Sequence, residues 1–396
     1  MRNISDYLSK SCEFCVNWHK QCYNCVIFIL LGFDKRRFMK LDSRIFVAGH
    51  KGLVGSAIVK ELQTRGYTNL ITADKSQLDL RDFNAVEAFF KVQNIEIVFL
   101  CAAKVGGILA NSTYRADFIY DNLAIQNNVI FNAHRFGVQK LLFLGSSCVY
   151  PKDAPQPMNE NCLLTSELEY TNEPYAIAKI AGLKLAESFA LQYGCNFIAV
   201  MPTNLYGEND NFDLRNSHVL PALLRKIFLA KCLECGEIER VRENLGENYE
   251  VILREFGISA KSVNIWGSGN VRREFLHADD MARACVFLME RVDFSDLARD
   301  LQNHKAKEIR NTHINIGSGV DISIRDLAKL IQKIVGFGGK LVFDTSKPDG
   351  TSQKLLDITK LKQLGFAPQI SLESGIKSVY ASYLDSSTHA VNGGGI

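Results

Sequence analysis

Proline and tryptophan are scarce in this sequence, which has 8 prolines and 2 tryptophans among 396 residues. Low-complexity tracts, internal repeats and a collagen-like glycine period are absent, which excludes fibrous and repeat architectures. Neither charge dominates, since 46 basic residues stand against 43 acidic ones without a long basic run. We therefore expect no nucleic-acid partner. The longest apolar run near the N-terminus, residues 26–31, is far shorter than the roughly 20 residues of a membrane span, so we expect no membrane contact.

The sequence does contain enough apolar material for two lobes. It is 47% hydrophobic and 22% charged, and single hydrophobic cores rarely grow beyond about 250–300 residues. Four cysteines and many polar residues precede the apolar run at 26–31, which is not the order of a secretory signal. We expect a cytoplasmic protein in which the 11 cysteines are mostly reduced.

Residues 1–38 differ from the rest of the chain, and we interpret them as an N-terminal extension of doubtful function that precedes Met39. A sharper alternative is a zinc knuckle. The gap between its two Cys-x-x-Cys pairs is shorter than the usual zinc-finger spacing, so we favour an extension without metal. The candidate ligands are Cys12, Cys15, His19, Cys22 and Cys25.

From residue 44 onward, short apolar β-branched runs alternate with longer amphipathic segments. This pattern is typical of βαβ units, and continuously apolar strands indicate a sheet buried on both faces. We predict an α/β fold with a Rossmann-type doubly wound parallel sheet in a domain at 39–205, completed by parts of 275–316. The expected strands are residues 44–48, 69–73, 96–101, 140–144 and 196–201.

Residues 206–396 are expected to form mainly a smaller C-terminal α/β lobe. A helix is predicted at 219–231, and a charged segment at 232–261 is interpreted as a solvated helical insertion. Its Cys232/Cys235 pair could bind a metal only with ligands from elsewhere. Strand patterns at 263–266 and 314–316 and a helix pattern at 324–335 are assigned to this lobe.

The first expected strand leads directly into a GxxGxxG turn. Glycines at such a turn let the backbone approach a pyrophosphate, which sits at the positive N-terminus of the following helix. The position of the turn after the first strand of a βαβ series favours a dinucleotide site over a plain tight turn. The expected cofactor contacts in this turn are Gly49, His50, Lys51, Gly52, Leu53, Val54 and Gly55.

The end of the second strand indicates which dinucleotide binds. Asp74 would accept hydrogen bonds from the ribose 2′-hydroxyl of NAD, whereas Lys51 and Lys75 would bind the 2′-phosphate of NADP. Both an acidic and two basic side chains are therefore available at this position. Because the two lysines outnumber the one aspartate, we favour NADP(H) as the cofactor.

A helical segment carries Tyr175 and Lys179 four residues apart, on one face of the helix. A nearby ammonium group stabilises phenolate and lowers the pKa of the tyrosine, so that it can exchange a proton with a carbonyl. Ser146, at the end of the expected strand 140–144, could give that carbonyl a second hydrogen bond.

Through the glycine turn, Ser146 and the Tyr175/Lys179 pair, the chain resembles the extended short-chain dehydrogenase/reductase family. Within it, the chain is similar to the 3,5-epimerase/4-reductases of GDP-4-keto-6-deoxymannose over about residues 43–383. The departures are residues 1–38, the insertion at 232–261, and Lys75 where the family often has arginine. The motifs that carry this resemblance are residues 48–52, 103–108, 145–151, 171–175, 201–207 and 346–350.

The resemblance implies an NADP(H)-dependent enzyme that inverts C3 and C5 of GDP-4-keto-6-deoxy-D-mannose and reduces C4 to give GDP-L-fucose. An alternative is the same chemistry, or one part of it, on a GDP-4-keto-6-deoxy-heptose. It also implies Cys148 as base and His218 as acid for the epimerisation. A regulator that binds the cofactor without turnover is disfavoured, because the full catalytic set is present: Ser146, Cys148, Tyr175, Lys179 and His218.

Further contacts follow from the same resemblance, together with a homodimer formed through the Tyr-x-x-x-Lys helix. Additional cofactor contacts would be Ala102, Ala103, Tyr175, Lys179, Pro202, Asn204, Leu205 and His218. Contacts to the GDP-sugar substrate would be Ser147, Asn204, Arg225, Lys226, Trp266, Arg273 and Lys347.

Overall fold

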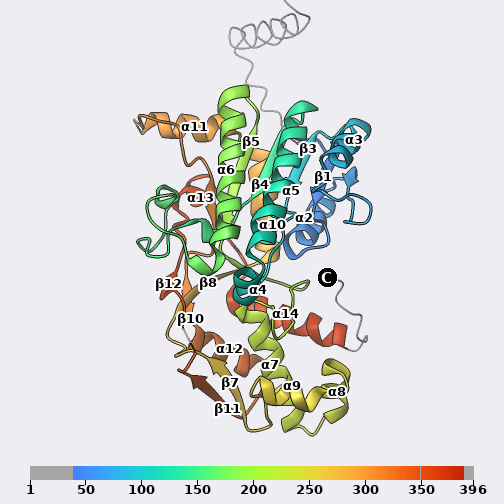
Figure 1. The fold of residues 1–396 in the computed structure, drawn as a ribbon, viewed down its shortest axis with the longest axis vertical. Helices are drawn as coiled ribbons and strands as arrows, with labels where there is room; N and C mark the ends of the chain where they lie inside the picture. Colours follow the sequence, from blue (N-terminus) through green and yellow to red (C-terminus); the bar gives the residue numbers. More distant parts are fainter. Residues whose placement is uncertain (1–38, 305, 348, 388–396) are drawn as a thin grey trace, which may run out of the picture. The chain divides into compact units, whose positions relative to one another are not determined.

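The computed structural model describes residues 39–304, 306–347 and 349–387 (Figure 1). The extension at 1–38 and its zinc alternative lie outside these residues and stay predictions. Among the helices of the described part, none is long and apolar enough to cross a membrane.

A six-stranded parallel sheet in the order β2-β1-β3-β4-β5-β9 confirms the predicted doubly wound fold. The chain changes direction across the sheet at β1, which pairs with β2 on one side and β3 on the other. Ligands bind such sheets at this point, beyond the carboxyl ends of the strands. The strands are β1 (Ile45–Ala48), β2 (Leu70–Ile71), β3 (Ile97–Leu100), β4 (Lys140–Leu144), β5 (Phe197–Pro202) and β9 (Ile314–Ile316).

The assignment of residues 314–316 to the smaller lobe is wrong. Strand β9 pairs with β5 in the large sheet, and all three of its residues are buried. The chain returns to this sheet through the helices that follow strand β8 (Arg272–His277), so that part of the 275–316 segment lies in the large sheet. A three-residue apolar run carries no sign of which sheet it joins.

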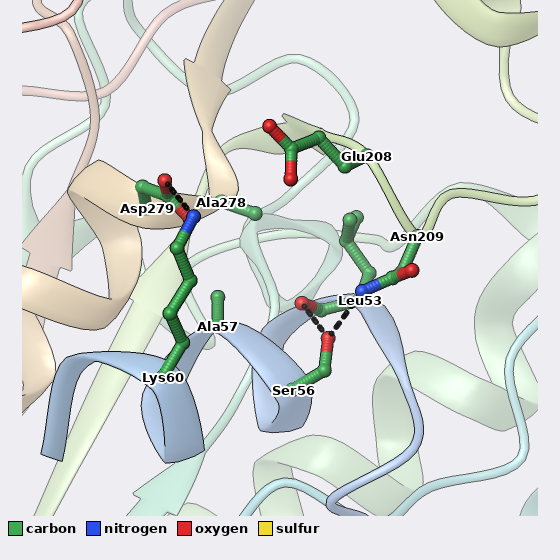
Figure 2. Close-up of a pocket in the computed structure, with 8 residues that line it drawn as sticks. All are labelled: Leu53, Ser56, Ala57, Lys60, Glu208, Asn209, Ala278 and Asp279. Carbon is green, nitrogen blue, oxygen red and sulfur yellow. Dashed lines mark hydrogen bonds and ion pairs between the residues drawn. The ribbon is translucent and has the colours of Figure 1, made fainter. Parts of the chain in front are cut away.

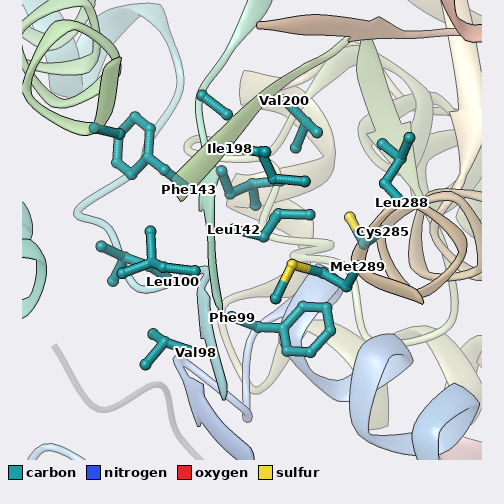
Figure 3. Close-up of a cluster of buried hydrophobic side chains, with 14 of the residues drawn as sticks. Val98, Phe99, Leu100, Leu142, Phe143, Ile198, Val200, Cys285, Leu288 and Met289 are labelled. Carbon is teal, nitrogen blue, oxygen red and sulfur yellow. The ribbon is translucent and has the colours of Figure 1, made fainter. Parts of the chain in front are cut away.

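Helices cover both faces of the large sheet, which explains its continuously apolar strands. Phe99 and Leu142 point toward Met289 of helix α10, whereas Phe143 points to the opposite face (Figure 3). On that face the Phe143 ring lies against Gly182 of helix α6. The covering helices are α2 (Leu53–Thr64), α3 (Phe83–Gln93), α5 (Arg115–Arg135), α6 (Glu173–Tyr193) and α10 (Ala278–Arg291).

A second hydrophobic core lies among the elements of the C-terminal half. Its strands form two small sheets, in which β8 pairs with β6, β10 and β12, and β7 pairs with β11. The strands are β6 (Asn204–Tyr206), β7 (Ser262–Trp266), β8 (Arg272–His277), β10 (Asp321–Ser323), β11 (Lys340–Asp344) and β12 (Gln353–Lys354). The helices are α7 (Val219–Glu234), α8 (Ile238–Leu245), α9 (Tyr249–Glu255), α12 (Ile324–Val335) and α14 (Leu372–Ser387).

The segment at 232–261 is helical, as predicted, but it is more than a solvated excursion. Val241 of α8 and Leu253 of α9 are buried in the second core. Cys232 is buried in the same core, whereas Cys235 is exposed. In the described ranges, no three His, Cys, Asp or Glu side chains are grouped as metal ligands would be.

Short helices complete the described chain and connect the larger elements. Three of them are 3-10 helices, of which η2 carries the Cys148 motif directly after β4. They are α4 (Ile108–Thr113), η2 (Ser147–Val149), η3 (Glu160–Cys162), η4 (Tyr170–Asn172), α11 (Phe294–Asn303) and α13 (Thr359–Gln363).

Helix α6 depends on a glycine for its close approach to the sheet. A Cβ atom at Gly182 would lie 2.5 Å from the Oε1 atom of Gln126 and 2.5 Å from the Phe143 ring. We expect Gly182→Ala to lower the free energy of unfolding by about 1–3 kcal/mol, because an overpacked core must shift. Urea titration followed by circular dichroism measures this loss.

Gly194, at the end of the same helix, supplies the control. It has φ +68° and no atom within 4 Å of an added Cβ. Asparagine tolerates that left-handed conformation, so Gly194→Asn should change stability by less than about 0.5 kcal/mol. Equal stability of the two variants would contradict the packing argument.

Candidate active site

The expected functional residues gather where the parallel strands end at one edge of the large sheet. The turn after β1 carries the glycines, the segment after β3 carries Ala102 and Ala103, and Ser146 and Cys148 follow β4. Pro202 ends β5, and Asn204 begins β6 two residues later. These segments are far apart in sequence and meet because parallel strands share a carboxyl edge.

The glycine turn is closed so tightly that side chains would not fit. Gly49 has φ +86°, and a Cβ there would lie 2.7 Å from the Ala102 amide nitrogen. A Cβ at Gly55 would overlap the carbonyl oxygen of Gly49. Gly52 precedes α2 and offers no side chain to cap it, so no cap occupies the first amides of the helix. That arrangement fits a dinucleotide pyrophosphate.

Asp74 is engaged by its own turn. Its carboxylate accepts hydrogen bonds from the Ser76 hydroxyl at 2.6 Å and from the Gln77 amide at 3.2 Å, and it forms a 3.0 Å ion pair with Lys51. The Ser76 hydroxyl and Lys51 lower the pKa of Asp74 below its usual range. Lys75 is exposed beside it. Lys51 is engaged by the same ion pair, so a 2′-phosphate would take the place of the Asp74 carboxylate beside Lys51, with Lys75 as the second cation.

Tyr175, Ser146 and Lys179 form one cluster, as the sequence predicted. The Ser146 hydroxyl faces the Tyr175 phenol and lowers its pKa. The Lys179 ammonium donates to the Leu144 carbonyl at 2.8 Å and lies 5.8 Å from the centre of the Tyr175 ring. These contacts join the end of β4 to helix α6.

The pKa values in this cluster differ from the sequence expectation. Burial raises the pKa of Tyr175 well above its usual range, and the Cys148 thiol adds to the rise, while the Ser146 hydrogen bond lowers it. The pKa of Tyr175 is therefore raised, whereas the Tyr175/Lys179 spacing led us to expect that the lysine would lower it. Burial lowers the pKa of Lys179 itself to about 8. The phenol is therefore protonated at neutral pH and suited to donate a proton.

Cys148 lies beside this cluster in η2. The residue is buried, and its amide donates to the Ser146 hydroxyl oxygen at 3.4 Å. Burial raises the pKa of the thiol, whereas the hydrogen bond with Ser146 and the charges of Lys354 and Lys179 lower it. Lys354 was not among the expected site residues. It comes from β12, and its sequence signal was only its nearness to the 346–350 motif.

His218 lies at the N-terminus of α7, directly after a polar loop. That loop reaches the edge of the large sheet, since a Cβ at Gly107 would lie 3.3 Å from the Asn216 carbonyl oxygen. His218 keeps an exposed surface. Desolvation by the surrounding chain nevertheless lowers the pKa of its imidazole, so the neutral ring predominates at neutral pH.

Several expected substrate contacts lie on the strands of the second lobe. Trp266 is 65% exposed at the end of β7, and the Lys347 ammonium lies 5.5 Å from the centre of its ring. Burial of Arg273 in β8 lowers the pKa of its guanidinium, and the nearby charge of Asp349 raises it. The Asn204 amide donates to the Glu274 carbonyl at 2.9 Å, and Ser147 begins η2 beside Cys148.

Two other expected contacts have structural partners. The Arg225 guanidinium donates to the Asn244 side chain at 2.9 Å, the Asn244 carbonyl at 2.8 Å and the Phe212 carbonyl at 3.1 Å. The structure does not bring it to the cluster. The Lys226 ammonium is buried and donates to the Asn264 carbonyl at 3.2 Å, two residues before Trp266. Burial lowers its pKa to about 8.

A small separate pocket borders the outer side of α2 (Figure 2). Its polar groups pair with one another: Lys60 with Asp279 at 3.0 Å, and Asn209 with the Ser56 hydroxyl at 3.1 Å. Of the expected site residues, only Leu53 lines it. The Asn209 contact fastens the loop that leads to His218 to helix α2, and the Lys60–Asp279 ion pair joins α2 to the N-terminus of α10.

A glycine turn of this kind beside a Ser/Tyr/Lys cluster defines a nucleotide-dependent oxidoreductase of the extended short-chain type. The sequence model of the NAD dependent epimerase/dehydratase family matches residues 45–317. The chain belongs to this family.

Three relatives show how closely the chain follows individual members. It is 51% identical over 342 residues to the GDP-L-fucose synthase of Escherichia coli K12, covering 86% of this chain and 97% of that protein. It is 50% identical over 347 residues to the putative GDP-L-fucose synthase 2 of Arabidopsis thaliana, covering 88% and 93%. A solved GDP-D-glycero-L-gluco-heptose synthase from Campylobacter jejuni, crystallised in the presence of NADPH, is 46% identical with a TM-score of 0.83, covering 87% and 99%.

The cofactor end of the site generates a prediction about Lys51. We expect Lys51→Gln to weaken NADPH binding by about 1 kcal/mol or more through the lost charge-assisted contact to the 2′-phosphate. NADH affinity should change little, since NADH lacks that phosphate. Fluorescence titration with both dinucleotides measures the two dissociation constants, with Lys91→Gln, an exposed lysine of α3, as control. Equal loss for NADPH and NADH would refute the role of Lys51.

Proposed function

We propose that this chain catalyses the NADP(H)-dependent 3,5-epimerisation and 4-reduction of GDP-4-keto-6-deoxy-D-mannose to GDP-L-fucose. The observation that carries the proposal is the single cluster of Ser146, Cys148, Tyr175 and Lys179 next to the glycine turn. The strong similarity to GDP-L-fucose synthases supports the same activity. A cytoplasmic location belongs to the same proposal.

The epimerisation uses the acidity of carbons next to the 4-keto group. The Cys148 thiolate takes a proton from C3 or C5, and the electron pair of the broken C–H bond moves into the carbonyl, leaving charge on the C4 oxygen. Ser146 and Tyr175 donate hydrogen bonds to that oxygen. The protonated form of His218 returns a proton to carbon from the opposite face, which inverts the centre. Because burial lowers the pKa of this imidazole, the protonated form is the minor one at neutral pH.

The reduction uses the same oxygen contacts. When bound, NADPH supplies the hydride that C4 receives. Tyr175 gives its phenolic proton to the C4 oxygen, and its raised pKa keeps that proton in place until then. Lys179 fixes the start of α6 against the end of β4 through the Leu144 carbonyl. The ammonium group also faces the phenolate that the transfer leaves.

The two cores divide recognition between them. The first, with the glycine turn, Ala102, Ala103, Pro202 and Leu205 at its edge, would hold the dinucleotide. The second would hold the GDP end of the substrate. There, Trp266 offers a flat exposed face on which a guanine can stack, while Arg273 and Lys347 supply cations for the diphosphate. Ser147 and Asn204 would contact the sugar.

A GDP-4-keto-6-deoxy-heptose remains a second candidate substrate. The observation that favours it is the 46% identity and 0.83 TM-score to a GDP-heptose synthase that is matched over 99% of its chain. The two sugars differ beyond C5, so the catalytic cluster acts on both in the same way. Parallel assays on both GDP-4-keto sugars distinguish the candidates by kcat/KM.

We also propose that the chain forms a homodimer through helices α5 and α6. An apolar groove between them is lined by Ala116, Ile119, Pro174 and Ile177, with the ion-paired Arg115 and Glu173 at its border. Ile177 is 42% exposed, although it begins the apolar stripe of its helix. A second copy of the same two helices would cover this face by a two-fold axis.

The central test follows deuterium from deuterated water into the sugar. We expect Cys148→Ser to reduce deuterium exchange at C3 and C5 by about 100-fold or more, because a serine hydroxyl is a much weaker acid and leaves no base at neutral pH. His218→Gln should retain partial exchange with little inverted product. Mass spectrometry and NMR of the recovered sugar report both quantities.

Tyr175→Phe is the matched control for these variants. It should keep exchange measurable while nearly abolishing NADPH oxidation, because the phenol is needed chiefly when C4 is reduced. Full epimerisation and reduction by both the Cys148→Ser and the His218→Gln variants would refute the acid and base roles. Normal NADPH oxidation by Tyr175→Phe would refute the proton donor.

The dimer proposal is tested by a charge in the groove. Ile177→Glu should shift the molar mass measured by light scattering from dimer to monomer, because burying an unpaired carboxylate is costly. Val251→Glu, at an exposed apolar residue of α9, should leave the mass unchanged. A monomeric wild-type protein would contradict the proposal directly.

A further inference from the structure

The residue beside Cys148 that the proposed mechanism leaves unused is Lys354, in β12. In the parallel pairing of β12 with β8, Lys354 stands opposite Arg273. On its other side, the chain just beyond Lys354 pairs with Met158: the Met158 amide donates to the Leu355 carbonyl at 2.8 Å, and the Asp357 amide donates to the Met158 carbonyl at 2.8 Å. Residues 353–357 therefore lie between β8 and the segment that follows the Cys148 motif.

Two hydrogen bonds from backbone amides to side chains fix this strap, residues 353–357, at the level of Lys354. The Leu356 amide donates to the buried Glu274 carboxylate at 3.0 Å. The Leu355 amide donates to the side-chain oxygen of Gln156 at 2.8 Å. Both neighbours of the lysine on its C-terminal side are thus held, which limits where its side chain can reach.

One buried asparagine ties the strap to the Cys148 motif. The Asn315 amide group donates to the carbonyls of Met158 and Asp357 at 3.0 and 3.1 Å, so its oxygen is left to accept from the Tyr150 hydroxyl. His313 Nε2 lies 3.0 Å from the same hydroxyl and must then be the donor. Tyr150 is two residues from Cys148, and Asp357 is three from Lys354. The lysine and the thiol are consequently held by a common buried network.

The groups that act on the thiol come from three elements. The charges of Lys354 in β12 and Lys179 in α6 lower the pKa of the thiol, the Ser146 hydroxyl of its own loop lowers it too, and Tyr175 of α6 is the neighbouring titratable group. Lys179 is already bound to the Leu144 carbonyl. Lys354 itself also faces Arg273 and Glu169. Burial lowers the pKa of Lys354, and the nearby thiol and Glu169 raise it.

We propose that Lys354 stabilises the thiolate of Cys148 and is thereby a positioning residue of the epimerisation. The inference rests on the proposed function, in which that thiolate is the base. A thiol this buried would otherwise hold its proton at neutral pH, and an ammonium group fixed beside it favours the charged form. Lys354 acts on the substrate only through Cys148.

The test is a pH titration of the thiol without substrate. Thiolate absorbance is measured as the difference between each protein and its Cys148→Ser counterpart, which cancels the other cysteines and the tyrosines. We expect Lys354→Gln to raise the midpoint of the Cys148 titration by about one pH unit or more. Lys354→Arg should restore the wild-type midpoint, and Lys362→Gln, an exposed lysine nearby, should leave it unchanged.

Turnover gives a second signature. Deuterium exchange at C3 and C5 by Lys354→Gln should fall about tenfold at neutral pH and recover as the pH rises, because the thiolate fraction recovers. A merely structural loss would not recover with pH. An unchanged thiol midpoint in both Lys354→Gln and a second variant, Lys354→Met, overturns the inference, whatever happens to activity.

The two failures are distinguishable. If Cys148→Ser exchanges deuterium normally while the thiol midpoint depends on Lys354, the base in the proposed function is wrong and the lysine has no role in epimerisation. If Cys148→Ser loses deuterium exchange while the midpoint of the Cys148 titration does not depend on Lys354, the proposed function stands and only the inference is wrong.

Discussion

The arrangement of the two cores depends on Glu274, a buried residue whose carboxylate and backbone carbonyl accept hydrogen bonds from several segments. It accepts hydrogen bonds from the Gly319 amide at 2.6 Å and the Leu356 amide at 3.0 Å, while its backbone carbonyl accepts from Thr203 and Asn204. One residue of β8 thus fixes the turn after β5, the turn after β9 and the strap that carries Lys354. A carboxylate buried in this way is tolerated only because donors surround it.

The hydrogen bonds of Glu274 explain how two halves with separate cores can act on one sugar. The cofactor turn and the Ser146–Tyr175–Lys179 cluster belong to the large sheet, whereas Trp266, Arg273 and Lys354 belong to strands of the second lobe. In the proposed reaction, the C4 carbonyl of the sugar must contact residues from both the large sheet and the second lobe. Hydrogen bonds from backbone amides set the distance between the halves more strictly than long side chains would, because amides have little freedom to adapt.

Much of the fold and of the candidate active site could be predicted from the sequence. The strand run 140–144, the glycine turn and the Tyr175/Lys179 spacing are local patterns, and each lies where local patterning places it. The predictions that were wrong concerned residues whose partners lie far away in the sequence. The run at 314–316 has no mark of its sheet, and Arg225, one residue from Lys226, turns instead toward Asn244 of the insertion. Lys354 stayed hidden because its partner Cys148 is some two hundred positions away. The effect of burial on Tyr175 was equally invisible in the sequence.

The contacts of Arg225 change what the insertion at 232–261 means for the molecule. Asn244 of its helix α8 accepts two hydrogen bonds from the Arg225 guanidinium on α7, the helix whose first turn follows His218, and Phe212 before α7 accepts the third. Excising the insertion would remove two of these three acceptors from a half-buried cation. The insertion therefore supports helix α7, at whose N-terminus His218 lies, and an α7 without it would have to satisfy the Arg225 guanidinium in another way.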